Sequence, residues 1–245
     1  MDISTQQTPL NGTHVVVFGG SSGIGQATAA AVKAKGAIVT LVGRTPAKLE
    51  AAAHTIGGAQ TAIADIAERK SVEAVFDGMT RIDHLVITAG GLHVGKLADA
   101  DPDQLLVEIQ QRIAGAVYAI KAALPKMPPT GSIVLMGGQF SDRPPSNGAS
   151  IIAAAVRGME ALARSLALEL KPIRVNVIAP GLIDTPLFDV FGSEGRAALF
   201  AQAAEQLPVG RAGRADEVGE AITFLLGNGY MNAEVLHIDG GGRFV

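Results

Sequence analysis

A glycine-rich segment directly follows an apolar run near the start of the chain, and its residue types and spacing indicate an anion-binding site. The run His14–Phe18 leads into the sequence GGSSGIG at positions 19–25, and a helical pattern begins at Gly23. At such a junction backbone N–H groups and the positive end of a helix dipole favour an anion. Glycine also lets the backbone approach a pyrophosphate closely. We therefore expect a phosphate-binding turn, the alternative being a tight structural turn, at Gly19, Ser21, Ser22, Gly23, Ile24 and Gly25.

Short β-rich apolar runs alternate with helical patterns along nearly the whole chain. Most runs are continuously apolar, which is typical of strands buried on both faces. The alternation predicts βαβ units and an α/β fold with a parallel sheet and helices on both faces. The expected strands are His14–Phe18, Ile38–Val42, Thr61–Ala64, His84–Thr88, Ser132–Met136, Arg174–Ile178 and Val235–Ile238. The expected helices are Gly23–Lys35, Pro46–Thr55, Glu68–Gly78, Pro102–Ala123, Ala149–Glu169 and Asp216–Leu226.

The segment Asp184–Arg214 interrupts this alternation. It contains no strand pattern, several glycines, two prolines and three phenylalanines, at positions 188, 191 and 200. Long insertions in compact domains are often lids or binding loops, so we expect a substrate lid over residues 184–214. The phenylalanines either line an apolar pocket or anchor the insertion. Without repeats or long linkers, residues 1–245 are expected to form one domain.

Composition narrows the class of protein. The 245 residues are 48% apolar and 18% charged, which is typical of a globular chain. Lysine and arginine are scattered and the net charge is -3, so we expect no nucleic-acid partner. The chain has no cysteine, and its five histidines are widely separated, so we expect no metal. Its apolar runs are far shorter than the ~20 residues that a membrane helix needs. Because the first dozen residues lack signal-peptide features, we expect a cytoplasmic protein with no membrane partner.

The glycine turn and several later segments resemble, in order, motifs of the short-chain dehydrogenase/reductase family. The sequence FGGSSGIG at 18–25 is similar to the TGxxxGIG motif of the family. Asp65-Ile66 resembles the acidic motif after the third strand, and Thr88-Ala89-Gly90 stands where the family has NAG. Further similar segments, from the nicotinamide region to the C-terminal pattern, are Pro180-Gly181, Ile183, Thr185, 210–213, 217–218 and 238–241. The resemblance covers roughly residues 12–242.

This resemblance implies a Rossmann-like doubly wound sheet of about seven parallel strands. It also implies a bound nicotinamide dinucleotide and a homodimer or homotetramer. Outside the glycine turn, the residues expected to bind the dinucleotide are Arg44, Thr45, Asp65, Ile66, Ala89, Gly90, Pro180, Gly181, Ile183 and Thr185.

The residues after the second strand indicate which dinucleotide is bound. Selectivity for NAD needs a carboxylate near this point to accept a hydrogen bond from the ribose 2′-OH. No Asp or Glu occurs between residues 3 and 49, whereas Arg44 offers planar donors suited to a 2′-phosphate. We therefore expect the cofactor to be NADP(H), the alternative being that Arg44 is an ordinary solvated loop residue.

The four residues that carry the reaction in the family are all replaced in this chain. The resemblance assigns proton transfer to a tyrosine beside a lysine, substrate polarisation to a serine, and support of a water relay to an asparagine. The matching positions here hold Ile152, Val156, Gly138 and Arg112. The chain has only two tyrosines, and neither is followed four residues later by a lysine. We expect an apolar pocket wall, with substrate-pocket residues at Gly138, Gln139, Ile152 and Phe188.

Four other side chains are candidates to replace the missing groups. Asp142 could act as a general acid if its pKa were raised, or it could be a turn residue. Arg112 could bind an anionic substrate or replace the water relay, or it could pair with Glu108 on the helix surface. His93 is either catalytic or a solvated loop histidine. Tyr118 is either catalytic or packed in the core or an interface. The catalytic residues therefore stay unknown from the sequence.

Two functions of different classes fit these features. The first is an NADP(H)-dependent oxidoreductase with a non-standard site, acting on an apolar substrate that needs no proton from a tyrosine, such as an imine or an activated alkene. The second is a non-catalytic dinucleotide-binding sensor, scaffold or partner subunit. A third possibility is that the glycine turn serves packing alone, without a cofactor.

Overall fold

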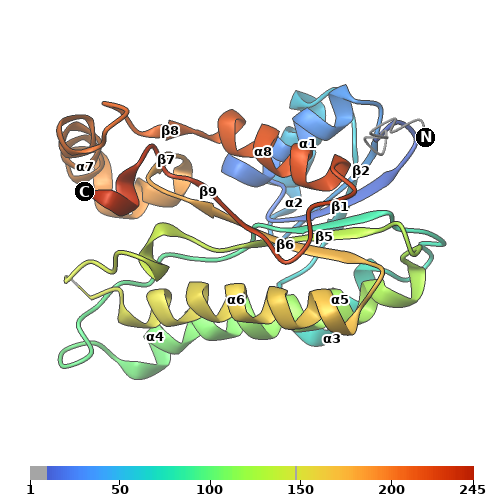
Figure 1. The fold of residues 1–245 in the computed structure, drawn as a ribbon, viewed down its shortest axis with the longest axis horizontal. Helices are drawn as coiled ribbons and strands as arrows, with labels where there is room; N and C mark the ends of the chain where they lie inside the picture. Colours follow the sequence, from blue (N-terminus) through green and yellow to red (C-terminus); the bar gives the residue numbers. More distant parts are fainter. Residues whose placement is uncertain (1–9, 147) are drawn as a thin grey trace.

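Three layers make up the protein, with one parallel sheet between two layers of helices (Figure 1). The computed structural model describes residues 10–146 and 148–245, so the first nine residues, on which part of the signal-peptide argument rests, lie outside it. The strands of the sheet are β1 (His14–Phe18), β2 (Ile38–Gly43), β3 (Gln60–Ile63), β4 (His84–Ile87), β5 (Ser132–Met136), β6 (Arg174–Pro180) and β9 (Val235–Ile238). Among the described residues, no helix is long and apolar enough to cross a bilayer.

The strand order β3-β2-β1-β4-β5-β6-β9 confirms the predicted doubly wound Rossmann-like fold. Strand β1 pairs in parallel with β2 on one side and with β4 on the other, so the winding direction reverses between β1 and β4. In open parallel sheets a crevice forms at such a reversal, outside the carboxyl ends of the strands, and ligands bind there. The topology therefore places the glycine turn after β1 at the site of a crevice.

Helices lie on both faces of the sheet, and most of them pack an apolar side against the strands. One face carries α1 (Gly23–Ala34), α2 (Pro46–Thr55) and α8 (Ala215–Gly227), whereas the other carries α3 (Arg69–Val75), α4 (Pro102–Ile109), α5 (Gly115–Ala123) and α6 (Ser150–Glu169) (Figure 1). Successive strand residues point to opposite faces, so Val15 and Val17 pack on the α1 and α8 side and Val16 and Phe18 on the α5 and α6 side. Each fully buried residue of this kind contributes about 1.5–3 kcal/mol relative to exposure.

The structure departs from the predicted elements in two places that matter for the site. The predicted helix Pro102–Ala123 is interrupted by a π-helical segment, Gln110–Ala114 (η1), between α4 and α5. In addition, the segment after β6 contains regular secondary structure, which the sequence pattern did not predict. It contains the helix α7 (Gly192–Gln206) and the short strand β7 (Ile183–Asp184), which pairs with β8 (Gly213–Arg214). Helix α7 buries only Ala203, so its sequence lacks the apolar stripe from which a helix can be predicted.

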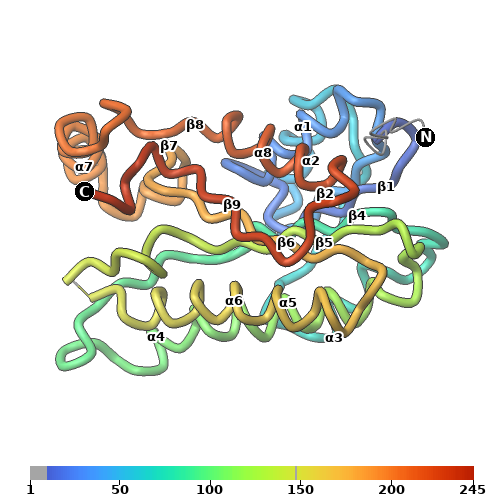
Figure 2. The backbone as a smooth tube through the Cα atoms, in the orientation of Figure 1, coloured from blue at the N-terminus to red at the C-terminus, as the bar shows by residue number. Residues whose placement is uncertain are grey.

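The C-terminal residues after β9 lie beside α7, as the backbone trace shows (Figure 2). Val209, just beyond α7, donates a backbone hydrogen bond to the carbonyl of Gly240 at 3.3 Å. A Cβ atom on Gly242 would lie 2.9 Å from Cδ2 of Leu207, so the two segments are in close contact. The end of the chain therefore supports one side of the crevice.

Stability of the fold should depend on the protonation of His84, which lies in β4. Its side chain is buried and its Nδ1 is 2.8 Å from the hydroxyl of Ser132. Burial lowers the pKa of His84 to about 4, with a smaller opposing effect of Asp83 and a further lowering by Arg174. The unfolded chain takes up this proton near pH 6.5 but the native protein does so only near pH 4. Stability is therefore lost as the pH falls through this window, by about 3 kcal/mol in total.

Urea denaturation at pH 7, 5.5 and 4.5 tests this expectation. The free energy of unfolding of His84→Gln should fall less steeply with decreasing pH than that of the unsubstituted protein. The control His54→Gln changes an exposed histidine of α2 and should keep the original pH dependence. An identical pH dependence in the unsubstituted protein and His84→Gln would contradict the assignment.

Candidate functional site

One cavity of about 810 Å³ opens at the carboxyl ends of β1, β2, β4, β5 and β6. Its lining combines the glycine turn, the segments that follow these strands, and residues of η1, α6 and α7. The predicted binding and pocket residues that line it are Gly19, Ser21, Ser22, Gly23, Ile24, Gly25, Arg44, Asp65, Ile66, Ala89, Gly90, Gly138, Gln139, Ile152, Pro180, Gly181, Ile183, Thr185 and Phe188. Thr45 is not among the lining residues and lies at the N-terminal end of α2.

The glycine turn is held against β2 and β4 at distances that exclude side chains. The N–H groups of Gly19 and Gly20 both donate to the carbonyl of Val42, at 2.9 and 3.2 Å. A Cβ atom on Gly25 would lie 2.2 Å from the Gly19 carbonyl oxygen and 2.6 Å from Oγ1 of Thr88. Thr88 in turn donates from Oγ1 to the carbonyl of Phe18 at 2.8 Å. The turn therefore has its shape because these positions carry no side chain.

The first turn of α1 is open to a ligand. Its N-cap residue, Ser22, makes no side-chain capping hydrogen bond within the described part of the chain, and the first turn contains no acidic residue. The N–H groups at a helix start have no partners inside the helix, and they carry the positive end of the helix dipole. Since Ser22, Gly23 and Ile24 line the cavity, these donors face a space where an anion would be stabilised.

Two basic side chains stand at the β2 end of the cavity. Arg44 follows β2 and is largely exposed, with its Nη1 only 3.9 Å from the Asp65 carboxylate. Lys48, four residues later in α2, also lines the cavity. Sequence reasoning missed Lys48, although its place one helical turn after Arg44 was a usable signal. Asp65 has a second contact, because its Oδ1 accepts a hydrogen bond from the N–H of Ala67 at 2.9 Å.

The segment after β6 closes the crevice near the glycine turn. A Cβ on Gly23 would be 3.2 Å from the side chain of Thr185, so the turn and this segment are in close contact. A Cβ on Gly181 would be 2.8 Å from the Cα of Asp239 and 2.9 Å from Oε1 of Gln139. Gly181 thus lets β6, the loop after β5 and the C-terminal segment approach one another.

An apolar wall stands beside the loop after β5. Ile152 and Val156 lie one turn apart in α6, are nearly fully buried, and form a cluster with Ala149. Leu92 and Phe140 pack against this cluster. Gly138 faces the same wall, because a Cβ there would lie 3.6 Å from Cγ1 of Val156. None of these side chains can donate or accept a proton.

Residues 184–214 contribute aromatic side chains both to the cavity and to the packing of this segment itself. Phe188 and Phe191 line the cavity, whereas Phe200 lies behind Phe188, with the ring centroids 5.9 Å apart and the planes nearly perpendicular. The guanidinium of Arg196 lies 5.0 Å from the Phe200 ring and pairs with Asp184. The two alternatives for these phenylalanines therefore both hold, at different positions.

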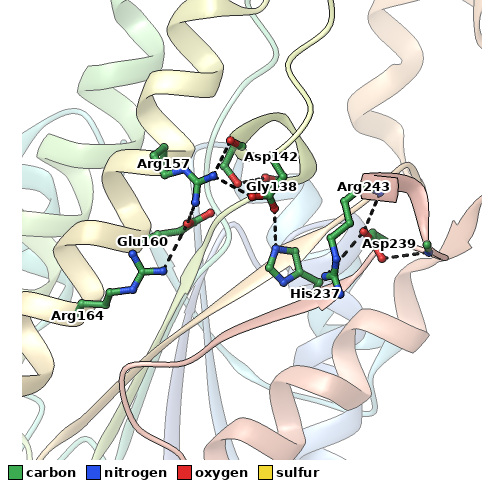
Figure 3. Close-up of polar contacts among 10 residues, drawn as sticks. Gly138, Asp142, Arg157, Glu160, Arg164, His237, Asp239 and Arg243 are labelled. Carbon is green, nitrogen blue, oxygen red and sulfur yellow. Dashed lines mark hydrogen bonds and ion pairs between the residues drawn. The ribbon is translucent and has the colours of Figure 1, made fainter. Parts of the chain in front are cut away.

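Asp142 is not suited to act as a general acid. It accepts hydrogen bonds from Arg157 and His237, each at 2.8 Å (Figure 3). It is not among the residues that line the cavity. Burial raises the pKa of Asp142, but these hydrogen bonds outweigh that effect and hold the pKa below its ordinary value. The hypothesis that required a raised pKa is therefore wrong, and Asp142 joins the loop after β5 to α6 and β9.

The structure also shows the contacts of the other three side chains considered as replacements for the missing catalytic groups. Tyr118 is partly buried and packs against the core cluster on the α5 side of the sheet. Arg112 lines the cavity and pairs with Glu108, with its Nε 2.8 Å from Oε2. His93 contacts the same carboxylate, with its Nδ1 2.7 Å from Oε1 of Glu108. Within residues 10–146 and 148–245, no group of three or more His, Asp or Glu side chains could hold a metal ion.

Comparisons with known proteins agree with this architecture. The family model described as Enoyl-(Acyl carrier protein) reductase matches residues 19–242. A human protein named 3-oxoacyl-[acyl-carrier-protein] reductase is 32% identical over 234 residues, covering 92% of this chain and 95% of the human protein.

Two solved structures are similar over nearly their whole lengths. A small-chain dehydrogenase in complex with NADPH has a TM-score of 0.84 and 32% identity, and the alignment covers 96% of this chain and all of that one. The MalC reductase/Diels-Alderase from Malbranchea aurantiaca has a TM-score of 0.89 and 25% identity, covering 98% of this chain and all of MalC.

The close approach at the turn yields a stability prediction. Gly25→Ala places a methyl group against the Gly19 carbonyl, so it should lower the free energy of unfolding by about 1–3 kcal/mol. Gly138→Ala is the matched control, because Gly138 has an extended backbone and its added methyl would meet Val156 at an ordinary contact distance. Chemical denaturation of both variants measures the difference. Equal stability of the two variants would show that the turn tolerates a side chain.

Proposed function

The chain belongs to the short-chain dehydrogenase/reductase family, and from this premise we propose that it is an NADP(H)-dependent oxidoreductase that works without a tyrosine proton donor. Members of this family bind a nicotinamide dinucleotide. The observation that carries the proposal is one cavity in which a glycine turn and two cations stand at one end and an apolar wall stands at the other.

The residues present fit a dinucleotide with a 2′-phosphate. In this proposal the open first turn of α1 binds the pyrophosphate, since Gly19 and Gly25 leave no side chain in its way. Arg44 and Lys48 bind the 2′-phosphate, because the guanidinium of Arg44 has only one long ion pair to replace. The other residues proposed to contact the dinucleotide are Asp65, Ile66, Ala89, Gly90, Pro180, Gly181, Ile183 and Thr185.

The apolar wall limits the kind of substrate that can react. A bound NADPH supplies a hydride and is itself oxidised to NADP⁺. Gly138, Ile152 and Val156 cannot protonate an alkoxide as it forms, so a simple ketone gains little from this site. What these residues do is exclude water and fix an apolar group against the cofactor. An iminium ion suits such a site, because hydride addition gives a neutral amine and needs no proton. An activated alkene also suits it, provided that the enolate formed by hydride addition takes its proton from water as the product leaves the site.

Residues 184–214 are proposed to act as the substrate lid. Phe188 and Phe191 face the cavity from this segment, and Phe200 with Arg196 fixes the opposite side of the aromatic cluster. A segment of this kind would shield the reacting atoms from water. The homo-oligomer and the cytoplasmic location stay predictions from the sequence. A non-catalytic dinucleotide-binding protein is the alternative function, and the turnover test below separates the two.

The proposed phosphate contact gives a prediction for cofactor preference. Arg44→Gln should weaken NADPH binding by about tenfold or more, because it removes charge-assisted hydrogen bonds to the 2′-phosphate, and it should leave NADH binding unchanged. Titrations followed by nicotinamide fluorescence measure both constants. Arg69→Gln, which removes an exposed arginine of α3 outside the cavity, is the control. A parallel loss of NADPH and NADH affinity would contradict the assignment.

The apolar wall gives a prediction for turnover. In a panel of cyclic imines, conjugated enones and simple ketones, NADPH oxidation at 340 nm should be measurable with the first two classes and near background with ketones. The triple variant Gly138→Ser/Ile152→Tyr/Val156→Lys introduces a proton donor and should raise ketone reduction selectively. Absence of turnover with every class, despite NADPH binding, would favour the non-catalytic alternative. Ketone reduction as the strongest activity of the unsubstituted protein would contradict the proposed mechanism.

A further inference from the structure

Arg112 is the buried cation of the cavity that the proposed cofactor contacts do not use. Its side chain is only 9% exposed, yet it lines the cavity. It belongs to the π-helical segment Gln110–Ala114, between α4 and α5. A π turn shifts side chains relative to a regular helix, and such turns are frequent at functional sites.

The guanidinium of Arg112 lies flat against the turn after β4. A Cβ on Gly90 would be 3.0 Å from Cζ of Arg112 and 3.1 Å from Nη1, so a side chain there would push the guanidinium from its position. Nη2 donates to the carbonyl of Gly91 at 2.8 Å. The next residue, Leu92, packs against the apolar cluster of Ile152 and Val156. Arg112 is therefore placed between the end of β4 and the apolar wall.

Glu108 holds this guanidinium in one orientation. Its carboxylate is fully buried, and Oε2 accepts from Nε of Arg112 at 2.8 Å. The other oxygen, Oε1, accepts from the backbone N–H of His93 at 2.9 Å and lies 2.7 Å from its ring Nδ1. An ionised carboxylate only accepts hydrogen bonds, so Nδ1 of His93 must carry a proton. Glu108 is therefore a positioning group, which fixes Nε of Arg112 and makes no hydrogen bond with Nη1.

Nη1 of Arg112 is the donor left for a ligand. Within residues 10–146 and 148–245 Nη1 makes no hydrogen bond, and it is not one of the fully buried polar atoms that lack a partner. An arginine with Nε and Nη2 fixed presents the N–H groups of Nη1 in a defined direction, which suits a planar oxyanion.

The charges around the cavity favour an anion at this end as well. Its charged lining side chains, within the described residues, are four cations and one carboxylate, namely Arg44, Lys48, Arg112, Arg143 and Asp65. Arg44, Lys48 and Asp65 belong to the β2 and β3 end, where the 2′-phosphate is proposed to bind. Arg112 and Arg143 belong to the β4 and β5 end, beside the apolar wall, where no acidic side chain lines the described part of the cavity.

We propose that Arg112, oriented by Glu108, binds a carboxylate of the substrate, so that the physiological substrate is an apolar compound that carries a carboxylate next to its reducible bond. This inference rests on the proposed function and narrows the class of substrate that the proposed oxidoreductase reduces. An iminium ion without an anionic group would meet a guanidinium at close range, whereas a carboxylate would be attracted to it. The apolar wall receives the remainder of the same molecule.

Paired probes test this proposal by binding rather than by turnover. The protein, saturated with NADP⁺, is titrated calorimetrically with trans-cinnamate and with cinnamamide, which share shape but differ in charge. The unsubstituted protein should bind cinnamate at least about tenfold more tightly, since a charge-assisted hydrogen bond contributes roughly this much. In Arg112→Gln the ratio should fall to about one, with NADPH affinity unchanged. Arg143→Gln, which changes the other cation at this end, should keep most of the preference.

A second variant guards against misfolding. Arg112→Gln leaves the buried Glu108 carboxylate without its partner, which is costly. The double variant Glu108→Gln/Arg112→Gln removes both charges and should show the same loss of preference.

Three results would overturn the proposal: no preference for cinnamate in the unsubstituted protein, a preference that survives in both Arg112 variants, or a loss of NADPH affinity in these variants. The titrations are repeated without NADP⁺, so that a failure of the protein to bind any dinucleotide is recognised separately from a failure of Arg112 to bind the carboxylate.

Discussion

The contact between the glycine turn and the end of β4 is the constraint on which the rest of the site depends. Gly19 and Gly25 meet Thr88 and each other at distances that no side chain can enter. This contact lies where β1 and β4, paired in parallel, end and the helices that follow them turn to opposite faces of the sheet (Figure 1). The crevice at the reversal is thus a consequence of backbone packing, and it opens the N-terminus of α1 to a ligand.

The two ends of the cavity differ in chemistry because different elements build them. Arg44, just after strand β2, and Lys48, in helix α2, are exposed or lightly paired and suit a phosphate group. Helix α6 supplies Ile152 and Val156, which suit an apolar group. The π-helical segment adds Arg112, which is buried and fully oriented. In the proposed function, the basic end, the apolar wall and the fixed guanidinium together suit hydride transfer to an acceptor that needs no protein acid.

Much of this architecture could be predicted from the sequence because its causes are local. Continuous apolar runs such as Val15–Phe18 reveal strands buried on both faces, and the glycine positions reveal where backbones must touch. The absence of a tyrosine–lysine pair could be found by counting residues. The π-helical segment could not be predicted, since the register of a long helix depends on tertiary contacts such as those of Arg112 with Glu108 and Gly91. Helix α7 was missed because it buries almost no apolar surface. The direction of the Asp142 pKa required partners distant in the sequence, Arg157 and His237.

We infer that the cavity binds a phosphorylated nicotinamide dinucleotide even though the chain has no tyrosine–lysine pair of the usual spacing. Calorimetric titration of the unsubstituted protein with NADPH and with NADH tests it most directly. NADPH should bind at least about tenfold more tightly than NADH, because the 2′-phosphate gains charge-assisted hydrogen bonds. Absence of binding by either dinucleotide, or tighter binding of NADH, would contradict it.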